Sequence, residues 1–152
     1  MPKVKSAFDI AKHLAEMGLF VCGGGVRDLY LGRIPKDLDT FVPSDSLNEW
    51  FKTFRDLGYK QKRRLFFKDG VTLDIVDTDA KSPIDIVEQF DCDVCKWYMG
   101  DEPIPLNDSI RRATDNMIAT FDLSMDLFGT SLRRAEKLRS TGWHVMVREA
   151  KL

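Results

Sequence analysis

Net charge is almost absent from this chain of 152 residues, in which 23 basic side chains stand against 24 acidic ones. A charge of −1 creates no global field toward nucleic acid or membranes, so any such attraction has to be local. Long apolar runs are also missing: no stretch approaches the roughly 20 residues that cross a bilayer. No basic, apolar leader opens the chain. These absences predict a protein that is neither exported nor embedded in a membrane.

Cysteine and histidine are scarce, with three and two residues respectively. The cysteines cannot all pair, and each lies in an apolar stretch where a reduced thiol packs as a small hydrophobe. The spacing of Cys92 and Cys95 occurs in zinc and redox sites. A structural zinc site needs four ligands, however, and Cys22, His13 and His144 have no helpful spacing. We therefore expect packed thiols in a reducing, cytoplasmic compartment.

What is present is the composition of a globular domain. Hydrophobic residues make up 43 % of the chain and charged residues 31 %, which excludes a disordered or fibrous protein. The length suits one domain with its own core. Neither an internal repeat nor a low-complexity linker divides it. We therefore predict one core domain over 1–152, in which 109–152 forms a helical C-terminal extension.

Hydrophobic periodicity predicts an alternation of helices and strands. Helical spacing covers 8–17, 26–31, 47–57 and 84–90. Short apolar runs or alternation predict strands at 19–22, 37–42, 59–68, 71–76 and 91–98. Two further helical patterns, 110–121 and 131–140, follow in the tail. This order favours an α+β fold built on a mixed sheet, with the aromatic stripe of Trp50, Phe51 and Phe54 in the core.

Two aspartates stand two residues apart on one predicted strand. Because side chains alternate along a strand, Asp37 and Asp39 share a face, with Cα atoms roughly 6 to 7 Å apart. Carboxylate oxygens so placed suit magnesium, and pairs of magnesium ions are common in nucleotidyl transfer. A third carboxylate from a neighbouring strand would complete the site. Asp74, which points away from the apolar face of its strand, is the first candidate, with Asp77 and Asp79 as fallbacks.

Three consecutive glycines, Gly23, Gly24 and Gly25, lie between a short apolar run and a helix. Without side chains the backbone can approach a phosphate, and unpaired N–H groups at a helix start point toward it. Arg27, in the first turn of that helix, is suited to hold phosphate oxygens in a bidentate manner. Asp28 is expected to brace Arg27 or a backbone amide rather than to bind metal. The segment therefore predicts a triphosphate-binding turn.

The run GGGVRDLYLGR at 23–33, followed by KDLD at 36–39, resembles the head domain of class II tRNA nucleotidyltransferases and bacterial poly(A) polymerases. In that family the pattern reads GGxVRDxxLGRxxxDxD, and so many fixed positions at fixed spacing are a specific signal. The resemblance is dense over 22–42 and thinner to about residue 98. It implies the polymerase-beta-like nucleotidyltransferase fold, with a sheet of about five strands and helices on one face.

The resemblance also implies an activity: transfer of a nucleoside monophosphate from a triphosphate such as ATP or CTP to an acceptor hydroxyl. Asp37 and Asp39, with Asp74, become the catalytic metal ligands for two Mg²⁺ ions, with Mn²⁺ as an alternative. The first acceptor is an RNA or tRNA 3′ end. A protein or small-molecule hydroxyl is the second, and a catalytically idle nucleotide-binding or RNA-binding module is a third interpretation.

Two weaker matches lie downstream. The segment FDCDVC at 90–95 resembles the family motif DFTIN, whose aspartate lies near the nucleotide ribose; only Asp91 is carried over, because Asp93 and Cys95 replace the threonine and asparagine. Arg133 and Arg134 echo an arginine motif in the family's neck, which implies weak RNA contacts. The family's neck, body and tail, which read the base and grip tRNA, have almost no room in this chain.

Two basic runs admit two interpretations, an RNA-binding track or an ordinary solvated face. One run lies in the predicted strand region at 60–64 and the other in the predicted helix at 133–139.

Overall fold

The computed structural model describes residues 2–123 and 129–148. Its helices are α1 (Pro2–Glu16), α2 (Gly24–Tyr30), α3 (Leu47–Asp56), α4 (Pro83–Val87), α5 (Asp108–Asp115) and α6 (Thr130–Ser140), with short 3₁₀ helices η1 (Ser44–Ser46) and η2 (Asp93–Cys95). Its strands are β1 (Phe20–Cys22), β2 (Leu38–Pro43), β3 (Lys60–Lys62), β4 (Leu65–Lys68), β5 (Val71–Thr78), β6 (Trp97–Met99), β7 (Pro103–Pro105), β8 (Ile118–Asp122) and β9 (His144–Arg148). No helix in the described part of the chain is long and apolar enough to cross a membrane.

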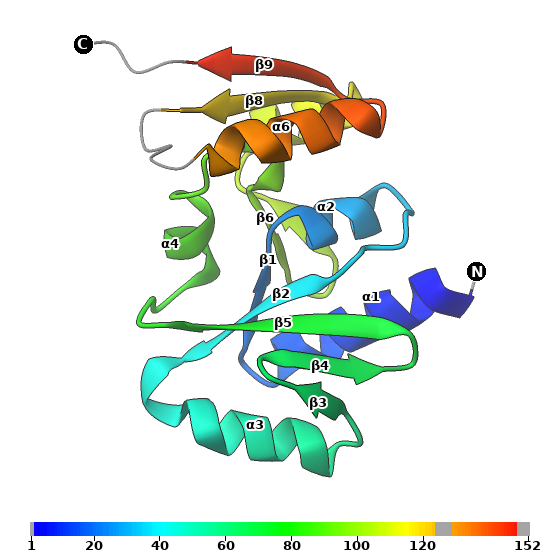
Figure 1. Cartoon of the computed structure of the whole chain (residues 1–152), viewed down its shortest axis with the longest axis vertical. Helices are drawn as coiled ribbons and strands as arrows, with labels where there is room; N and C mark the ends of the chain where they lie inside the picture. The colour runs from blue at the N-terminus through cyan, green and yellow to red at the C-terminus, as the bar shows by residue number, and fades with distance from the viewer. Residues whose placement is uncertain (1, 124–128, 149–152) are drawn as a thin grey trace.

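A mixed sheet of seven strands, in the order β3-β4-β5-β2-β1-β6-β7, forms the larger part of the molecule (Figure 1). At its centre β2 runs antiparallel to β1 and parallel to β5. Alternation along these strands buries Leu38 and Leu73 completely on one face. It places Asp39 and Asp74, which are direct partners across β2 and β5, on the opposite face. The register thus separates an apolar face from an acidic one.

Helices cover the two faces of this sheet unequally. The main core lies on the apolar face, where α1 contributes Leu14 and α3 contributes Phe54, both fully buried. Phe54 and its partly buried neighbours Trp50 and Phe51 pack against this core, which confirms the predicted aromatic stripe. On the other face α4 packs Val87 against the region of β1. The part of that face beside Asp39 lines a cavity.

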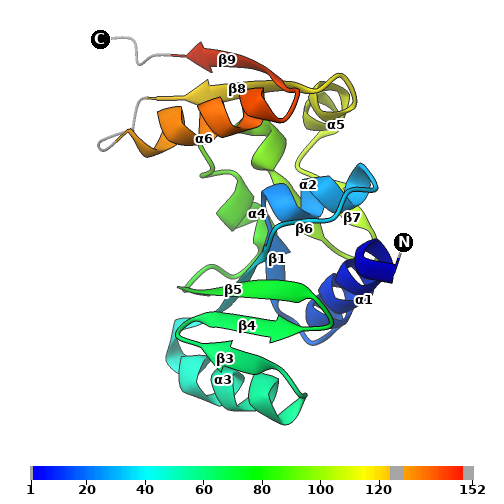
Figure 2. The same cartoon turned by 45° about the vertical axis from the view of Figure 1, so that its right-hand side comes forward.

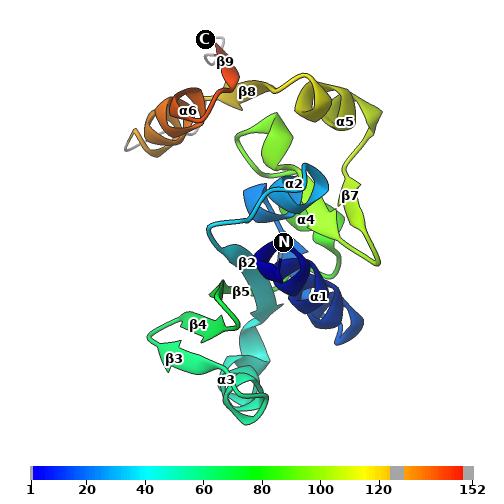
Figure 3. The ribbon, with the colours of Figure 1, turned by 90° about the vertical axis from the view of Figure 1, so that its right-hand side faces the viewer.

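The C-terminal segment forms a β-α-β unit, in which β8 and β9 are parallel and α6 lies between them in sequence. Parallel neighbours need such a crossover, and α6 supplies it. The unit has its own apolar cluster, which includes Cys92, Phe121 and Trp143. Figure 2 shows it stacked above α2, at the opposite end of the molecule from α3, and Figure 3 shows α5, β8 and α6 in a row across that end.

The prediction of a purely helical tail is therefore wrong at two places. The pattern over 110–121 ends as a helix at Asp115, because Met117 takes a left-handed φ of 54° and breaks the backbone repeat. Residues 118–122 then pair with β9 as a strand. The second strand of the tail, β9, was not predicted at all.

The sheet also contains more strands than the predicted five. The strand expected at 59–68 is a hairpin of β3 and β4, which turns at Arg63 with a φ of 58°. The strand expected at 91–98 is the 3₁₀ turn η2 followed by the short β6. The strand β7 was missed. The order and type of the elements from α1 to β5 otherwise follow the prediction.

Candidate active site

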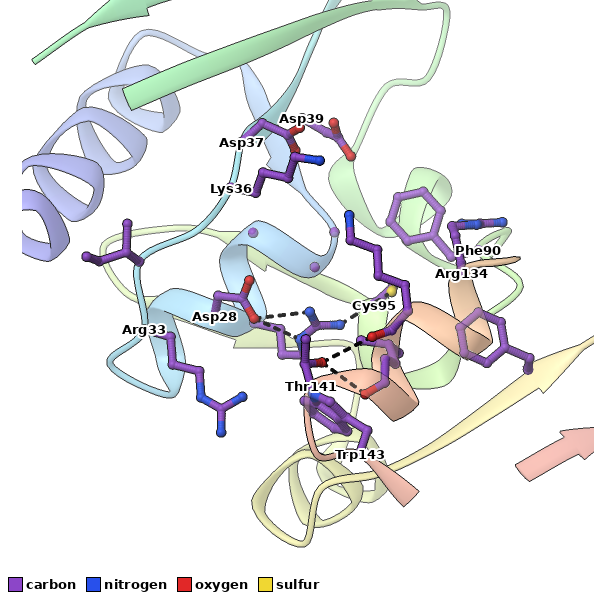
Figure 4. A pocket seen from close by; sticks show the side chains of 18 residues that line it. Asp28, Arg33, Lys36, Asp37, Asp39, Phe90, Cys95, Arg134, Thr141 and Trp143 are labelled. Atoms are coloured by element: carbon purple, nitrogen blue, oxygen red, sulfur yellow. Dashed lines mark hydrogen bonds and ion pairs between the residues drawn. The ribbon is translucent and has the colours of Figure 1, made fainter. Parts of the chain in front are cut away.

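A cavity of about 590 Å³ opens between the start of α2, the beginning of β2 and the helix α6 (Figure 4). Its volume lies within the range usual for small-molecule sites. The structure gathers most of the predicted site residues on its walls, and these are Gly23, Gly24, Gly25, Arg27, Asp37, Asp39 and Arg134. Residues far apart in the sequence therefore converge on one concave site.

The shape of the turn requires glycine at two of its three positions, Gly23 and Gly25. Gly23 has φ 107° and ψ −160°, a conformation that L side chains rarely adopt, and its N–H donates to the carbonyl of Trp97 at 2.8 Å. A Cβ atom on Gly23 would lie 3.5 Å from Oδ2 of Asp39. A Cβ atom on Gly25 would overlap the carbonyl oxygen of Asp37. The turn is thus pressed directly against the strand that carries both aspartates.

Three carboxyl groups interact on the acidic face of the sheet. Burial, followed by the charges of Asp37 and Asp74, raises the pKa of Asp39 to about 7, while the charge of Arg134 acts in the opposite direction. Burial and then the charge of Asp37 also raise the pKa of Asp74, and Arg64 opposes them. The local excess of negative charge is therefore only partly balanced by the protein's own cations.

This donor set suits a hard divalent cation, because it offers carboxylate oxygens and uncompensated negative charge. Among residues 2–123 and 129–148, however, no three His, Cys, Asp or Glu side chains are gathered closely enough to form a complete metal site. The fallback ligands are less suitable: Asp77 is held by Arg64 at 2.8 Å, and Asp79 is exposed beyond the end of β5. Asp74 therefore stays the best third candidate, although it lies outside the cavity wall.

Arg27 is almost completely buried, with 7 % of its surface exposed. Its guanidinium donates twice to Oδ1 of Asp28, at 3.2 and 3.0 Å, so Asp28 braces it as predicted. A further N–H points at the Cys95 sulfur at 3.7 Å, and the guanidinium lies 5.0 Å from the centre of a Trp143 ring. Arg27 thus lines the cavity in a fixed orientation and joins α2 to the C-terminal unit.

Helix α6 forms a wall of the cavity through Arg134 and Lys137, and Arg33 and Lys36 add two more cations from the segment between α2 and β2. Only Arg134 was predicted. The missed α6 residues follow a helical face, since positions 134, 137, 138 and 141 all line the cavity. That periodicity is visible in the sequence, but nothing local indicates that the face meets the glycine turn.

Besides Asp74, two predicted residues lie away from the cavity wall. Asp91 accepts hydrogen bonds from the Ser131 hydroxyl and, at 2.5 Å, from Arg134, so it anchors α6. Arg133 is exposed and donates to the Thr130 hydroxyl at 3.2 Å. The structure thus connects Asp91 to the site through Arg134 rather than placing it in the wall.

The seven-stranded mixed sheet, with the aspartate strand beside a glycine turn, is the nucleotidyltransferase fold. Over 95 % of its length the chain superposes on 40 % of the Thermotoga maritima CCA-adding enzyme complexed with tRNA, with a TM-score of 0.67 and 19 % identity. The TM-score is also 0.67, at 19 % identity and the same coverage, for a CCA-adding enzyme in complex with CTP. For the Bacillus stearothermophilus CCA-adding enzyme in complex with CTP it is 0.60, at 18 % identity over 95 % of this chain and 41 % of that one.

The chain therefore spans about 40 % of the length of these enzymes. No protein-family model and no curated protein sequence matches it. The likeness at this level of identity establishes the fold.

Proposed function

We propose that the chain is a metal-dependent nucleotidyltransferase that moves a nucleoside monophosphate from a triphosphate to an acceptor hydroxyl, with an RNA 3′ end, such as that of tRNA, as the favoured acceptor. One observation carries the proposal. In a nucleotidyltransferase fold, the Asp39 carboxylate lies directly beside the Gly23 turn, at the wall of a cavity of about 590 Å³.

The triphosphate is bound by backbone and cations together. The N–H groups of Gly24 and Gly25, in the first turn of α2, have no partner within the helix and lie at the cavity wall. Lys36 lies one residue before the aspartate pair, and Lys137 faces the cavity from α6. Backbone N–H groups and lysine side chains around the same cavity would together neutralise the triphosphate, and they leave the acidic face open to a cation.

Asp37, Asp39 and Asp74 would hold the divalent cation, Mg²⁺ or Mn²⁺, on the acidic face of the sheet. When bound, such cations make the attacking oxygen more nucleophilic and stabilise the leaving pyrophosphate. Magnesium is usually held by one or two carboxylates together with substrate phosphates rather than by an all-protein cage. The open arrangement of the three carboxyl groups accords with that mode of binding.

RNA is the favoured acceptor for two reasons. Arg33, Lys36, Arg134 and Lys137 all line the cavity, so an approaching phosphate backbone meets positive charge there. Solved structures with this fold include CCA-adding enzymes in complexes with tRNA, with CTP and with ATP. A protein or small-molecule hydroxyl is the alternative acceptor, and the experiment below separates the two.

The purified chain is incubated with each α-labelled triphosphate, Mg²⁺ and, separately, RNA, protein and small-molecule fractions. We expect label in RNA from ATP or CTP. Asp39→Asn keeps the shape of the side chain but removes the charge, so transfer should fall roughly a thousandfold, equivalent to about 4 kcal/mol. Asp45→Asn removes an exposed aspartate from η1 and should leave the rate unchanged.

Equal labelling by the wild type and Asp39→Asn would refute the proposed enzymatic activity and favour the interpretation as a catalytically idle binding module. Label confined to the protein or small-molecule fraction would support the proposed transferase activity but refute RNA as the acceptor.

A further inference from the structure

The two cysteines of the DCDVC segment lie at opposite ends of a single tight turn. The N–H of Cys95 donates to the carbonyl of Cys92 at 3.2 Å, which closes η2. In a turn closed between residues i and i+3, the two Cα atoms lie within about 7 Å. Disulfides span Cα distances of roughly 4.4 to 6.8 Å. The turn thus holds the two Cα atoms within or close to the range that a disulfide spans.

Asp93 fixes this turn in place. One of its carboxylate oxygens accepts hydrogen bonds from the N–H of Val94 at 2.7 Å and from the N–H of Thr120 at 2.8 Å. The second bond ties η2 to β8. Both cysteines therefore belong to a rigid part of the fold.

The two thiols have different surroundings. Cys95 is half-buried and lines the cavity, where its sulfur lies 3.7 Å from Nη1 of Arg27. Cys92 is fully buried behind it, in the apolar cluster of the C-terminal unit. One thiol is accessible and faces a guanidinium, and the other is shielded but adjacent.

The pKa values of the two thiols shift in opposite directions, in agreement with these different surroundings. A hydrogen bond from Cys92 lowers the pKa of Cys95; burial opposes this, Arg27 and Arg134 lower the pKa further, and Asp91 raises it. The same hydrogen bond and burial raise the pKa of Cys92, so Cys95 is the more readily ionised thiol of the pair. The third cysteine, Cys22, is 1 % exposed, and burial raises its pKa to about 12.

We propose that Cys95 is a reactive thiol in the cavity wall, which hydrogen peroxide oxidises and which Cys92 then resolves to a disulfide. In the first step the O–O bond of the peroxide breaks, an S–O bond forms on Cys95, and the leaving oxygen departs as water. In the second step the Cys92 sulfur attacks that sulfenic acid, an S–S bond forms, and a second water leaves with the Cys92 proton. Two thiols are oxidised by two electrons, and one peroxide is reduced to two waters.

This chemistry goes beyond nucleotide transfer and does not depend on it. Its consequence for catalysis does rest on the proposed function: oxidation removes the sulfur acceptor from Arg27, and any adduct on Cys95 occupies the cavity. The two are therefore tested separately, and the thiol chemistry is measured in the absence of nucleotide.

The test begins with the folded wild-type chain, limiting iodoacetamide and mass mapping. Tryptic cleavage places Cys92 and Cys95 together in the peptide 82–96 and Cys22 in another. Because alkylation requires the thiolate, we expect Cys95 to react at least about tenfold faster than Cys22 or Cys92. In a separate sample that has not been alkylated, one equivalent of hydrogen peroxide should convert peptide 82–96 to a form lighter by two hydrogens.

Variants separate the two roles. Cys92→Ser should give a sulfenic acid on Cys95 that dimedone traps, without a disulfide, whereas Cys95→Ser should leave the peptide unoxidised. Circular dichroism checks that both variants fold, and the wild-type mapping stands without them. Alkylation of Cys95 no faster than that of Cys22, or peptide 82–96 with both thiols free after peroxide, would overturn the proposal.

Discussion

At the scale of single residues, the proposed metal ligand Asp39 is expected to lower the stability of the folded chain at neutral pH. Burial and the charges of Asp37 and Asp74 raise its pKa to about 7, so ionisation at neutral pH is unfavourable in the folded chain. The same ionisation supplies the charge that a divalent cation needs. The charge that the proposed metal site requires is therefore unfavourable for folding in the absence of the cation.

The sign of the pH dependence follows from this shift. The pKa of an aspartate in an unfolded chain is about 3.9, so the folded chain holds the Asp39 proton more tightly. Its contribution to stability is fully present below about pH 4 and is lost as the pH rises to about 7. A shift of this size corresponds to at most about 4 kcal/mol, and partial exposure reduces it to roughly 1–3 kcal/mol.

Asp39→Asn should therefore raise the free energy of unfolding by roughly 1–3 kcal/mol at pH 8 and change it little at pH 4. The measurement is urea unfolding in EDTA at both values of pH. Asp45→Asn is the control, because that side chain is exposed and remote from the site. A gain of stability that is the same at both pH values would contradict the assigned cause.

At the scale of elements, the contact between α2 and β2 decides the geometry of the site. The start of the helix approaches the strand so closely that a Cβ atom on Gly25 would overlap the Asp37 carbonyl. The backbone carbonyl of Asp37 cannot move aside as easily as the end of a flexible side chain can. Gly24 differs, because its added Cβ atom would meet only the Arg27 guanidinium, at 3.1 to 3.3 Å.

Gly25→Ala should therefore destabilise the chain by roughly 2–4 kcal/mol, because α2 has to move away from β2. Gly24→Ala should cost less, since a shift of a few tenths of an ångström in Arg27 relieves the contact. Urea unfolding of the two variants gives the comparison. Equal losses would show that the close approach of α2 to β2 does not set the cost.

The same comparison of elements explains which features the sequence could predict. The glycine turn and the Asp37/Asp39 pair were predictable, because local spacing places them on a turn and on one face of a strand. Strand β8 was not, because its residues continue a helical pattern and only pairing with β9 decides its structure. The position of α6 over the glycine turn could not be predicted either, because it depends on contacts between distant segments, such as that of Asp91 with Arg134.

At the scale of the whole molecule, the cavity has walls from both the seven-stranded sheet region and the C-terminal β-α-β unit. Arg27 connects them: it belongs to α2, is paired with Asp28, and stacks on Trp143 of the unit. Tyr30 also donates to Asp115 of α5, the helix that directly precedes the unit, at 2.5 Å. Because the contact of Arg27 with Trp143 crosses between the two parts, we expect the site to keep its shape only if both parts fold together.

A double-mutant cycle tests this coupling. Burial strengthens a cation–π contact, so Arg27→Met and Trp143→Leu should show an interaction energy of roughly 1–2 kcal/mol, obtained from the unfolding free energies of four proteins. The control cycle pairs Arg27→Met with Trp50→Leu on the remote helix α3, where the effects should add within about 0.5 kcal/mol. If both cycles gave the same coupling, the stacking of Arg27 on Trp143 would not hold the two walls together. If only the first showed coupling, the contact of Arg27 with Trp143 would be established as an energetic link between the two walls.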